Sequence, residues 1–240
     1  MEVFLGEVGK KLTDRWLTRI VLPGVLFAAA LALAAAPGRA GSFDVTAAVR
    51  WLDRLRADRY ATPAGRIAAL VAGLLVVTAP ALVADRLSRV VVRTWRLPAM
   101  KVAGPLRDVE QRVRAQHGVS MALVWPRLWQ LAPDSARQDV QAAWTGYSGA
   151  ALRTAWAVPY AVAGAWLLWW PGPVVAAALL ASGWRAGLRG AGVLGETIEA
   201  TVDTGLNGLA AALGVRLPHG RVRPDEGTEI DELLNKGRRP

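Results

Sequence analysis

Two long apolar runs without a charged side chain set the strongest limit on how this chain can fold. Residues 20–36 and residues 67–84 contain no Asp, Glu, Lys or Arg and are rich in Ala, Leu and Val. Each run approaches the roughly 20 residues with which a helix crosses the core of a bilayer. A third run covers residues 154–170, and a shorter fourth covers residues 174–188 when Arg185 extends its guanidinium to the headgroups. The pattern predicts an all-α integral membrane protein with four transmembrane helices in two pairs.

The composition points to the same class of protein. Hydrophobic residues make up 53% of the 240 residues, and the formal net charge is +10. Soluble proteins seldom combine so apolar a composition with so basic a charge. The chain contains no cysteine, which excludes a disulfide framework, a thiolate metal site and a cysteine nucleophile.

The segments flanking the first two runs predict amphipathic helices at the membrane surface. Residues 1–19 place apolar side chains four apart, which is typical of an amphipathic N-terminal helix. A cleaved signal peptide that ends after the first run is the alternative interpretation. Residues 37–66 predict an external loop that contains a second amphipathic helix.

The remaining segments predict a small helical cytoplasmic region. It covers residues 85–153, where Val140, Trp144, Tyr147 and Ala151 form an apolar stripe on one helix. Residues 192–214 predict an amphipathic cytoplasmic helix with an acidic face. Residues 218–240 are polar and predict a disordered tail, apart from a short helix near residues 229–234.

Lysine and arginine are distributed unevenly along the chain. If both termini are cytoplasmic, 23 of the 29 basic residues lie on the inside, and the external loop holds the other six. The positive-inside rule therefore predicts cytoplasmic N and C termini with four spans.

A basic stripe follows the second run. Arg86, Arg89, Arg93 and Arg96 recur at three, four and three residues and share one face of a helix. Such a juxtamembrane stripe predicts a contact with anionic membrane lipid, with solvated or paired arginines as the alternative. We expect no nucleic-acid partner, because interleaved aromatic residues and a binding motif are missing. The acidic face of residues 192–214 is expected to pair with this stripe.

Small residues are candidates for close helix packing. Gly73 lies four residues after Ala69, and Gly183 lies four residues before Gly187. This spacing permits close contact between helices within one chain or in a homo-oligomer.

The run GVSMALVWPRLWQLAPD, residues 118–134, is the most distinctive motif. Pro126 favours the first turn of a helix, so the run predicts a short helix over residues 126–130 that ends before Pro133. Its tryptophans are expected to pack against neighbouring helices or the membrane interface, or else to form the small cytoplasmic core. We interpret the run as a docking or packing motif of six residues: Trp125, Pro126, Arg127, Leu128, Trp129 and Asp134.

This run resembles the signature of a family of bacterial, notably actinobacterial, multi-pass membrane proteins. In that signature a Trp-Pro-Arg-Leu-Trp sequence precedes a helix and a membrane hairpin. The opening of the chain, residues 5–27, is similar to the opening of that family. The resemblance implies a bacterial inner-membrane location and no assigned reaction. The matching residues are Gly118, Trp125, Pro126, Arg127, Leu128, Trp129, Leu131, Pro133 and Asp134.

The sequence contains no recognisable catalytic frame. Its two histidines, His117 and His219, are expected to be loop and tail residues, and no phosphate-binding loop or nucleophile elbow is present. Three acids, Glu196, Glu199 and Asp203, lack the further ligand that a metal site needs. We therefore expect no enzyme activity, no cofactor and no metal.

These features favour a non-enzymatic membrane protein that acts by assembly or by binding a membrane or cytoplasmic protein partner. An oligomeric pore-forming or membrane-perturbing effector of a bacterial conflict or stress system is the alternative. A small transporter is a third reading, weakened because the first three spans carry no ionisable residue.

Overall fold

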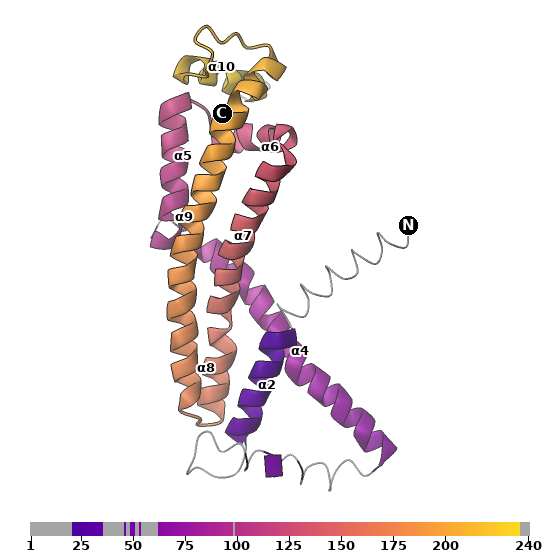
Figure 1. The fold of residues 1–240 in the computed structure, drawn as a ribbon. Helices are drawn as coiled ribbons and strands as arrows, with labels where there is room; N and C mark the ends of the chain where they lie inside the picture. Colours follow the sequence, from indigo (N-terminus) through magenta and orange to yellow (C-terminus); the bar gives the residue numbers. More distant parts are fainter. Residues whose placement is uncertain are drawn as a thin grey trace. The chain divides into compact units, whose positions relative to one another are not determined.

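The computed structural model describes residues 21–35, 46, 49, 50, 53, 62–97 and 99–235. Every regular element within these residues is helical and none is a strand, which confirms the all-α prediction. The predicted N-terminal helix, and nearly all of the predicted external one, lie outside the described residues. The elements, shown in Figure 1, are α2 (Leu22–Ala35), α4 (Pro63–Trp95), η2 (Lys101–Ala103), α5 (Gly104–His117), α6 (Met121–Leu131), α7 (Asp134–Ala155), α8 (Ala157–Trp166), α9 (Pro171–Leu213) and α10 (Pro224–Asn235).

The chain divides into two compact units. Unit 1 contains the described residues up to Val91 together with Leu152–Ser182. Unit 2 contains Val92–Ala151 and the described residues from Gly183 onwards. Helices α4, α7 and α9 contribute residues to both units, and each unit has a core of its own.

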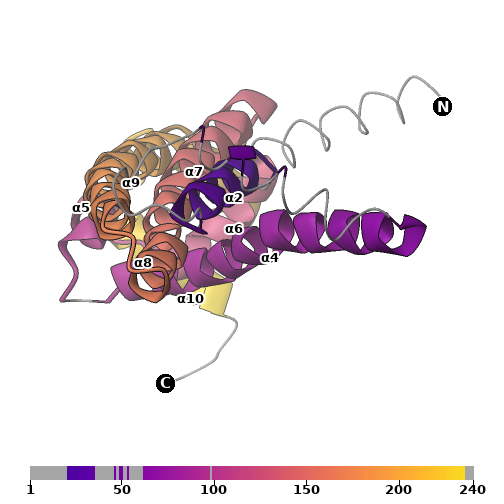
Figure 2. The same ribbon diagram turned by 90° about the horizontal axis from the view of Figure 1, so that it is seen from below.

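Unit 1 is organised around an aromatic cluster. Phe27 of α2 is 5% exposed, and its ring meets the ring of Tyr160 edge-on at 5.1 Å. Helix α2 lies beside α8 (Figure 2) and crosses α4 at Gly24. A Cβ atom at Gly24 would overlap the carbonyl oxygen of Val77, so this crossing requires a residue without a side chain.

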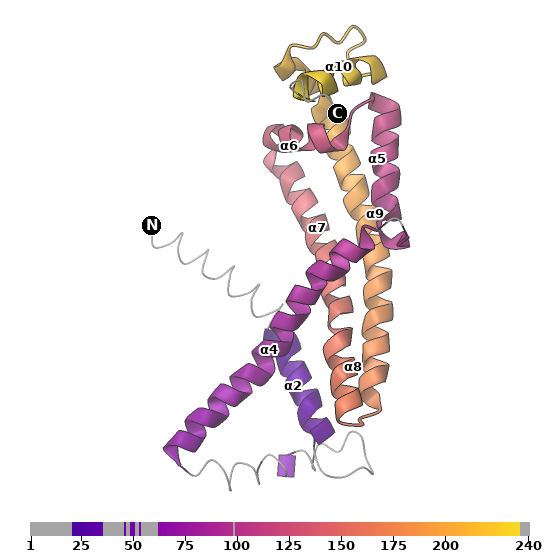
Figure 3. The ribbon, with the colours of Figure 1, turned by 180° about the vertical axis from the view of Figure 1, so that it is seen from behind.

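Helix α4 is the one described helix that is long and apolar enough to cross a membrane. It has 33 residues, whereas the apolar helix α2 has 14. Only 11% of its most apolar 18-residue stretch is buried, and Leu70 and Leu74 are 75% and 61% exposed. Its first turns stand away from the other described helices of unit 1 (Figure 3). A core helix of a soluble protein would bury these side chains.

The third apolar run forms two helices, not the predicted single helix over residues 154–170. Helix α7 ends at Ala155 and α8 begins at Ala157. Pro159 explains the interruption, because it has no N–H to donate to the carbonyl of Ala155 and its ring crowds that carbonyl. The turn that follows occupies residues 167–170, where Leu168 has a φ of 52°.

The fourth run and the predicted cytoplasmic helix form one continuous helix. Helix α9 begins at Pro171 and covers 43 residues, including both residues 174–188 and residues 192–214. Proline is well suited to the first position of a helix, and the sequence Pro171-Gly172-Pro173 opens α9. Gly190 lies within this helix at a close approach to α7, where a Cβ atom would be 3.1 Å from the Cα of Tyr147. The gain from close packing of α7 against α9 offsets the low helix propensity of glycine.

The core of unit 2 includes the C-terminal helix. Ile230 and Leu234 of α10 are 0% and 8% exposed and pack with Val113 of α5 and Val124 of α6. The predicted short helix near residues 229–234 is present as part of α10, whereas the prediction of disorder is wrong for residues 218–228 and for residue 235. Composition is misleading here because few apolar residues, correctly spaced on one face, are enough to dock a short helix on an existing core.

A close glycine contact joins α10 to the end of α5. Gly118 ends α5 with a φ of 70°, the left-handed conformation that favours glycine, and a Cβ atom there would overlap the carbonyl oxygen of Pro224. A Cβ atom at Gly227 would overlap the carbonyl oxygen of His117. Both glycines are therefore required for this packing.

Asp231 of α10 accepts a hydrogen bond at the start of α6. The backbone N–H of Ser120 donates to its Oδ2 atom at 2.8 Å, while Oδ1 is buried and has no hydrogen-bond partner among the described residues. Burial raises the pKa of Asp231, although the bond from Ser120 and the charge of Arg114 act in the opposite direction. Folding therefore favours the protonated carboxyl group.

This raised pKa predicts a pH-dependent effect of substituting Asp231. Its contribution to stability is fully present below the ordinary pKa of about 3.9 and is lost as pH rises through the raised value. Asp231→Asn, which keeps an acceptor and has no charge, should match the wild type near pH 3 and be more stable at pH 7. Asp231→Ala should lose about 1 kcal/mol relative to Asp231→Asn. Denaturant unfolding in detergent at both pH values measures this, and a pH-independent difference between wild type and Asp231→Asn would contradict it.

Candidate binding site

Helix α6 presents apolar side chains on two faces. Val124 and Leu128 are 0% and 1% exposed in the core of unit 2. Trp125 and Trp129 are half-buried on another face, with ring centroids 5.7 Å apart. The helix begins at Met121, five residues before the predicted start, so Pro126 lies inside it rather than in its first turn. Trp125 packs partly against the core as well, and together with Trp129 it gives α6 a second apolar face.

That second face lines a cavity of about 860 Å³, which we call the aromatic trough. Four helices of unit 2 form its walls. Trp125, Pro126 and Trp129 come from α6, Trp144 comes from α7, and Leu106 of α5 and Ile198 of α9 line it too. The volume lies within the range of about 300–1,000 Å³ that is usual for small-molecule sites.

Cationic side chains lie at the aromatic trough. The Cζ atom of Arg96 is 5.8 Å from the centre of the Trp144 ring, a cation–π geometry. Arg107 also lines the trough, and its guanidinium donates to the carbonyl oxygens of Leu97 and Met100, each at 3.1 Å. Arg107 is thus held by the loop after α4, whereas the described contact of Arg96 is with an aromatic ring.

Trp144 packs against buried aromatic side chains. The ring centroid of Tyr147 lies 5.8 Å from that of Trp144 and 5.5 Å from that of Trp95. Tyr147 is fully buried, and its hydroxyl group has no hydrogen-bond partner among the described residues. Burial raises the pKa of this phenol, and the nearby charge of Arg96 acts in the opposite direction. Gly187 of α9 lies against Trp95, since a Cβ atom there would be 2.6 Å from the indole Cη2 atom.

The predicted docking or packing motif therefore divides into separate roles. Leu128 is a core residue, and Trp125, Pro126 and Trp129 line the trough. Arg127 donates to the carbonyl of Leu123 within its own helix, at 2.7 Å. Asp134 is exposed at the start of α7, where it pairs with Arg137 at 2.6 Å.

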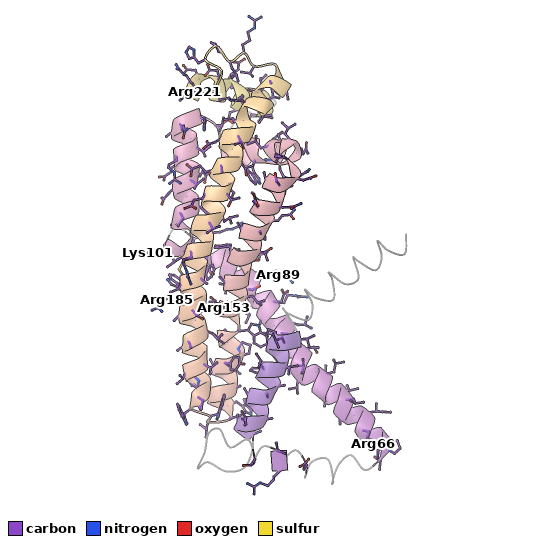
Figure 4. The ribbon with its side chains drawn as sticks, viewed as in Figure 1. Arg66, Arg89, Lys101, Arg153, Arg185 and Arg221 are labelled. Atoms are coloured by element: carbon purple, nitrogen blue, oxygen red, sulfur yellow. The ribbon has the colours of Figure 1, made fainter. Side chains whose placement is uncertain are left out.

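The four arginines of the basic stripe are exposed; Arg86, Arg89 and Arg93 lie on α4, where Figure 4 labels Arg89, and Arg96 follows directly after the end of α4. Arg89 pairs with Asp85 at 2.7 Å in the same helix. Arg96 lines the aromatic trough, and Arg86 and Arg93 complete the stripe.

The acidic face of α9 contacts α5 instead of the basic stripe, so that predicted pairing is wrong. Glu199 accepts two hydrogen bonds from Arg112, at 2.9 and 2.6 Å. This pairing lowers the pKa of Glu199 and raises that of Arg112. Asp203 lies 3.0 Å from Nε2 of His117, whose Nδ1 atom is 3.2 Å from the carbonyl of Val222. His117 therefore connects the end of α5 to α9 and to the segment that contains Val222.

The predicted packing glycines differ in their environments. Gly183 and Gly187 are buried in α9, but Gly73 is exposed on α4 and has no atom within 4 Å of the position of a Cβ atom. The described glycines at the closest approaches in unit 1 are instead Gly24 and the pair Gly164 and Gly172. Spacing alone did not identify them, because glycine is abundant throughout the chain.

The described residues contain no group of three or more His, Cys, Asp or Glu placed to hold a metal ion. The trough residues that sequence reasoning missed include Leu106, Arg107 and Ile198, whose helices meet only in the folded unit. No protein-family model matches the chain, and no similarity to a curated protein or to a solved structure was found. Functional interpretation therefore depends on the residues and their geometry.

Proposed function

We propose that this chain is a four-span protein of the bacterial inner membrane that acts by binding a partner and not by catalysis, with the aromatic trough as its binding surface. One observation carries the proposal. Trp125 and Trp129 lie in the same helix as the core residue Leu128, yet they line an open cavity. Large apolar side chains left open in this way are typical of a binding surface.

The exposed apolar surface of α4 supports the membrane part of the proposal. A signal sequence lies near the N terminus and a soluble core helix is buried, whereas α4 begins at Pro63 and is largely exposed. The distribution of basic residues supports cytoplasmic termini, with the residues of unit 2 on the cytoplasmic side. The resemblance of residues 118–134 to a signature of multi-pass membrane proteins agrees with this placement.

Two further contacts belong to the proposal. The exposed stripe of Arg86, Arg89 and Arg93 has the charge and position to contact anionic lipid headgroups. The exposed face of α4 around Gly73 offers a surface on which a second copy of the chain can pack closely.

The absence of cysteine makes a direct topology experiment possible. Single cysteines are introduced at exposed positions and treated in intact cells with a membrane-impermeant maleimide. Ala64→Cys and Leu168→Cys should react in intact cells, because both positions fall on the external side of the proposed topology. Gln111→Cys and Gln138→Cys should react only after the membrane is opened.

The same four variants also contain the result that would contradict the topology. If Gln111→Cys and Ala64→Cys react equally in intact cells, the residues before and after the second run lie on one side, and α4 does not span. If all four react in a soluble cell fraction, the membrane location itself is wrong.

A further inference from the structure

We propose that the aromatic trough binds a single acyl chain that carries an anionic headgroup. The inference rests on the proposed role of the trough as a binding surface and names the chemistry of its ligand. It follows from the shape of the trough, from the distribution of polar groups along it and from the position of Arg96.

The trough is elongated because a second cavity continues it. This cavity, of about 400 Å³, shares five lining residues with the first: Leu106, Glu110, Trp125, Pro126 and Ile198. Along α6 the two cavities are lined from Met121 to Gln130, which corresponds to about 13 Å at 1.5 Å per residue. An elongated apolar space of this kind fits an extended acyl chain better than a compact ligand.

Polar groups are concentrated at one end of this space. Arg96, Gln130 and Gln141 line the larger cavity but not the smaller one. The smaller cavity is lined instead by apolar side chains such as Val109 and Met121, and exposed Glu110 lines both cavities. A ligand with a long apolar chain and a polar group at one terminus matches this asymmetry.

The polar end selects an anion. Arg96 and Arg107 outnumber the one acidic residue that lines the larger cavity, Glu110, and the amide groups of Gln130 and Gln141 can donate hydrogen bonds. A carboxylate or a phosphate headgroup accepts from such donors, and charge-assisted bonds are the stronger kind. The stacking of Arg96 on Trp144 orients its charge beside the apolar cavity before a ligand binds. Free fatty acids and single-chain phospholipids share this chemistry.

Photo-crosslinking of the full chain in nanodiscs tests the proposal. Palmitate with a diazirine in its chain is the probe, and mass spectrometry locates the crosslinks. We expect saturable labelling of the peptide that contains Met121, Trp125 and Trp129. Competition by unlabelled palmitate or by a lysophosphatidylglycerol supports the proposal and identifies the headgroup source, and the uncharged methyl ester of palmitate should compete at least about tenfold less well.

Two exposed arginines of unit 2 provide a matched pair of variants. Arg96→Gln should weaken labelling about tenfold, because Arg96 lines the trough. Arg216→Gln removes the same charge from an exposed position outside both the trough and the basic stripe and should leave labelling unchanged. Ala122→Trp, which places a large side chain at the smaller cavity, should abolish labelling while hydrogen exchange of α5 remains that of the wild type.

Labelling that is confined to the apolar runs, or that is equally affected by Arg216→Gln and Arg96→Gln, would overturn the proposal. It would also fall if a synthetic acidic amphipathic helix blocked the trough and neither lipid competed, because the ligand would then be a protein segment. The cysteine experiment fails or succeeds independently, since it reports on the spans and the crosslink reports on unit 2.

Discussion

A chain that ends at Leu217 is expected to lose the folded core of unit 2. Truncation removes three buried side chains, Val222, Ile230 and Leu234, and with them the acceptor for the N–H of Ser120. Burial of each such side chain stabilises a fold by about 1.5–3 kcal/mol, so the combined loss approaches the whole stability of a small domain. Hydrogen exchange in detergent should show amides of α5 and α6 exchanging at rates typical of an unfolded chain.

A control truncation and a matched pair of substitutions isolate the cause. A chain that ends at Asn235 keeps every contact described for α10 and should exchange like the wild type. Within α10, Ile230→Ala should destabilise unit 2 by about 2–5 kcal/mol, because Ile230 is fully buried. Leu233→Ala removes a similar side chain that is 49% exposed and should cost less than about 1 kcal/mol. Preserved protection of α5 in the Leu217 truncation would mean that α10 does not hold the core together.

The role of α10 illustrates what the sequence could not predict. A short helix near residues 229–234 follows from local patterning, and it is present. Its burial depends on Gly118 and Gly227, which allow backbone to meet backbone between segments more than 100 residues apart. Such a contact leaves no periodic signal in either segment. Composition alone indicated disorder because most residues of this helix are polar or charged.

The sequence did not predict the helix boundaries, for a different physical reason. Apolar runs end where the chain leaves an apolar environment, whereas helices end where backbone hydrogen bonds end. Helix α9 therefore continues through Arg185 and Gly190 into the amphipathic segment, and the run over residues 154–170 is interrupted inside its apolar stretch at Trp156. Uncharged runs locate the apolar segments of the chain, but they could not predict how many helices each segment contains.

The candidate site was predictable in part. The apolar stripe of Val140 and Trp144 and the spacing of Trp125 and Trp129 follow the 3.6-residue period, and these four residues line the trough together. The opposite charges of the acidic face and the basic stripe suggested a pairing that does not form. Charge complementarity is not specific to one partner, and Arg112 of α5 contacts Glu199 instead.

Substitution of the adjacent motif residues Leu128 and Trp129 should affect different properties. Stability should depend mainly on Leu128, and ligand binding mainly on Trp129. Leu128→Ala is expected to destabilise unit 2 by about 2–5 kcal/mol, because Leu128 is 1% exposed and Gly205 of α9 has no side chain with which to fill the cavity. Trp129→Ala should cost about 1 kcal/mol, since half-buried side chains lose less contact on truncation. Denaturant unfolding followed by circular dichroism in detergent measures both.

Ligand binding should show the reverse order for the same two residues. Trp129→Ala removes one aromatic wall of the trough and should weaken labelling by the diazirine palmitate about tenfold in a folded protein. Leu128→Ala should leave labelling close to that of the wild type under conditions in which it remains folded, because Leu128 lies on the core face of α6. If both variants lose stability and labelling in parallel, the two faces of α6 do not have separate roles. The motif would then be a core element only, and its tryptophans would have no binding function apart from the fold.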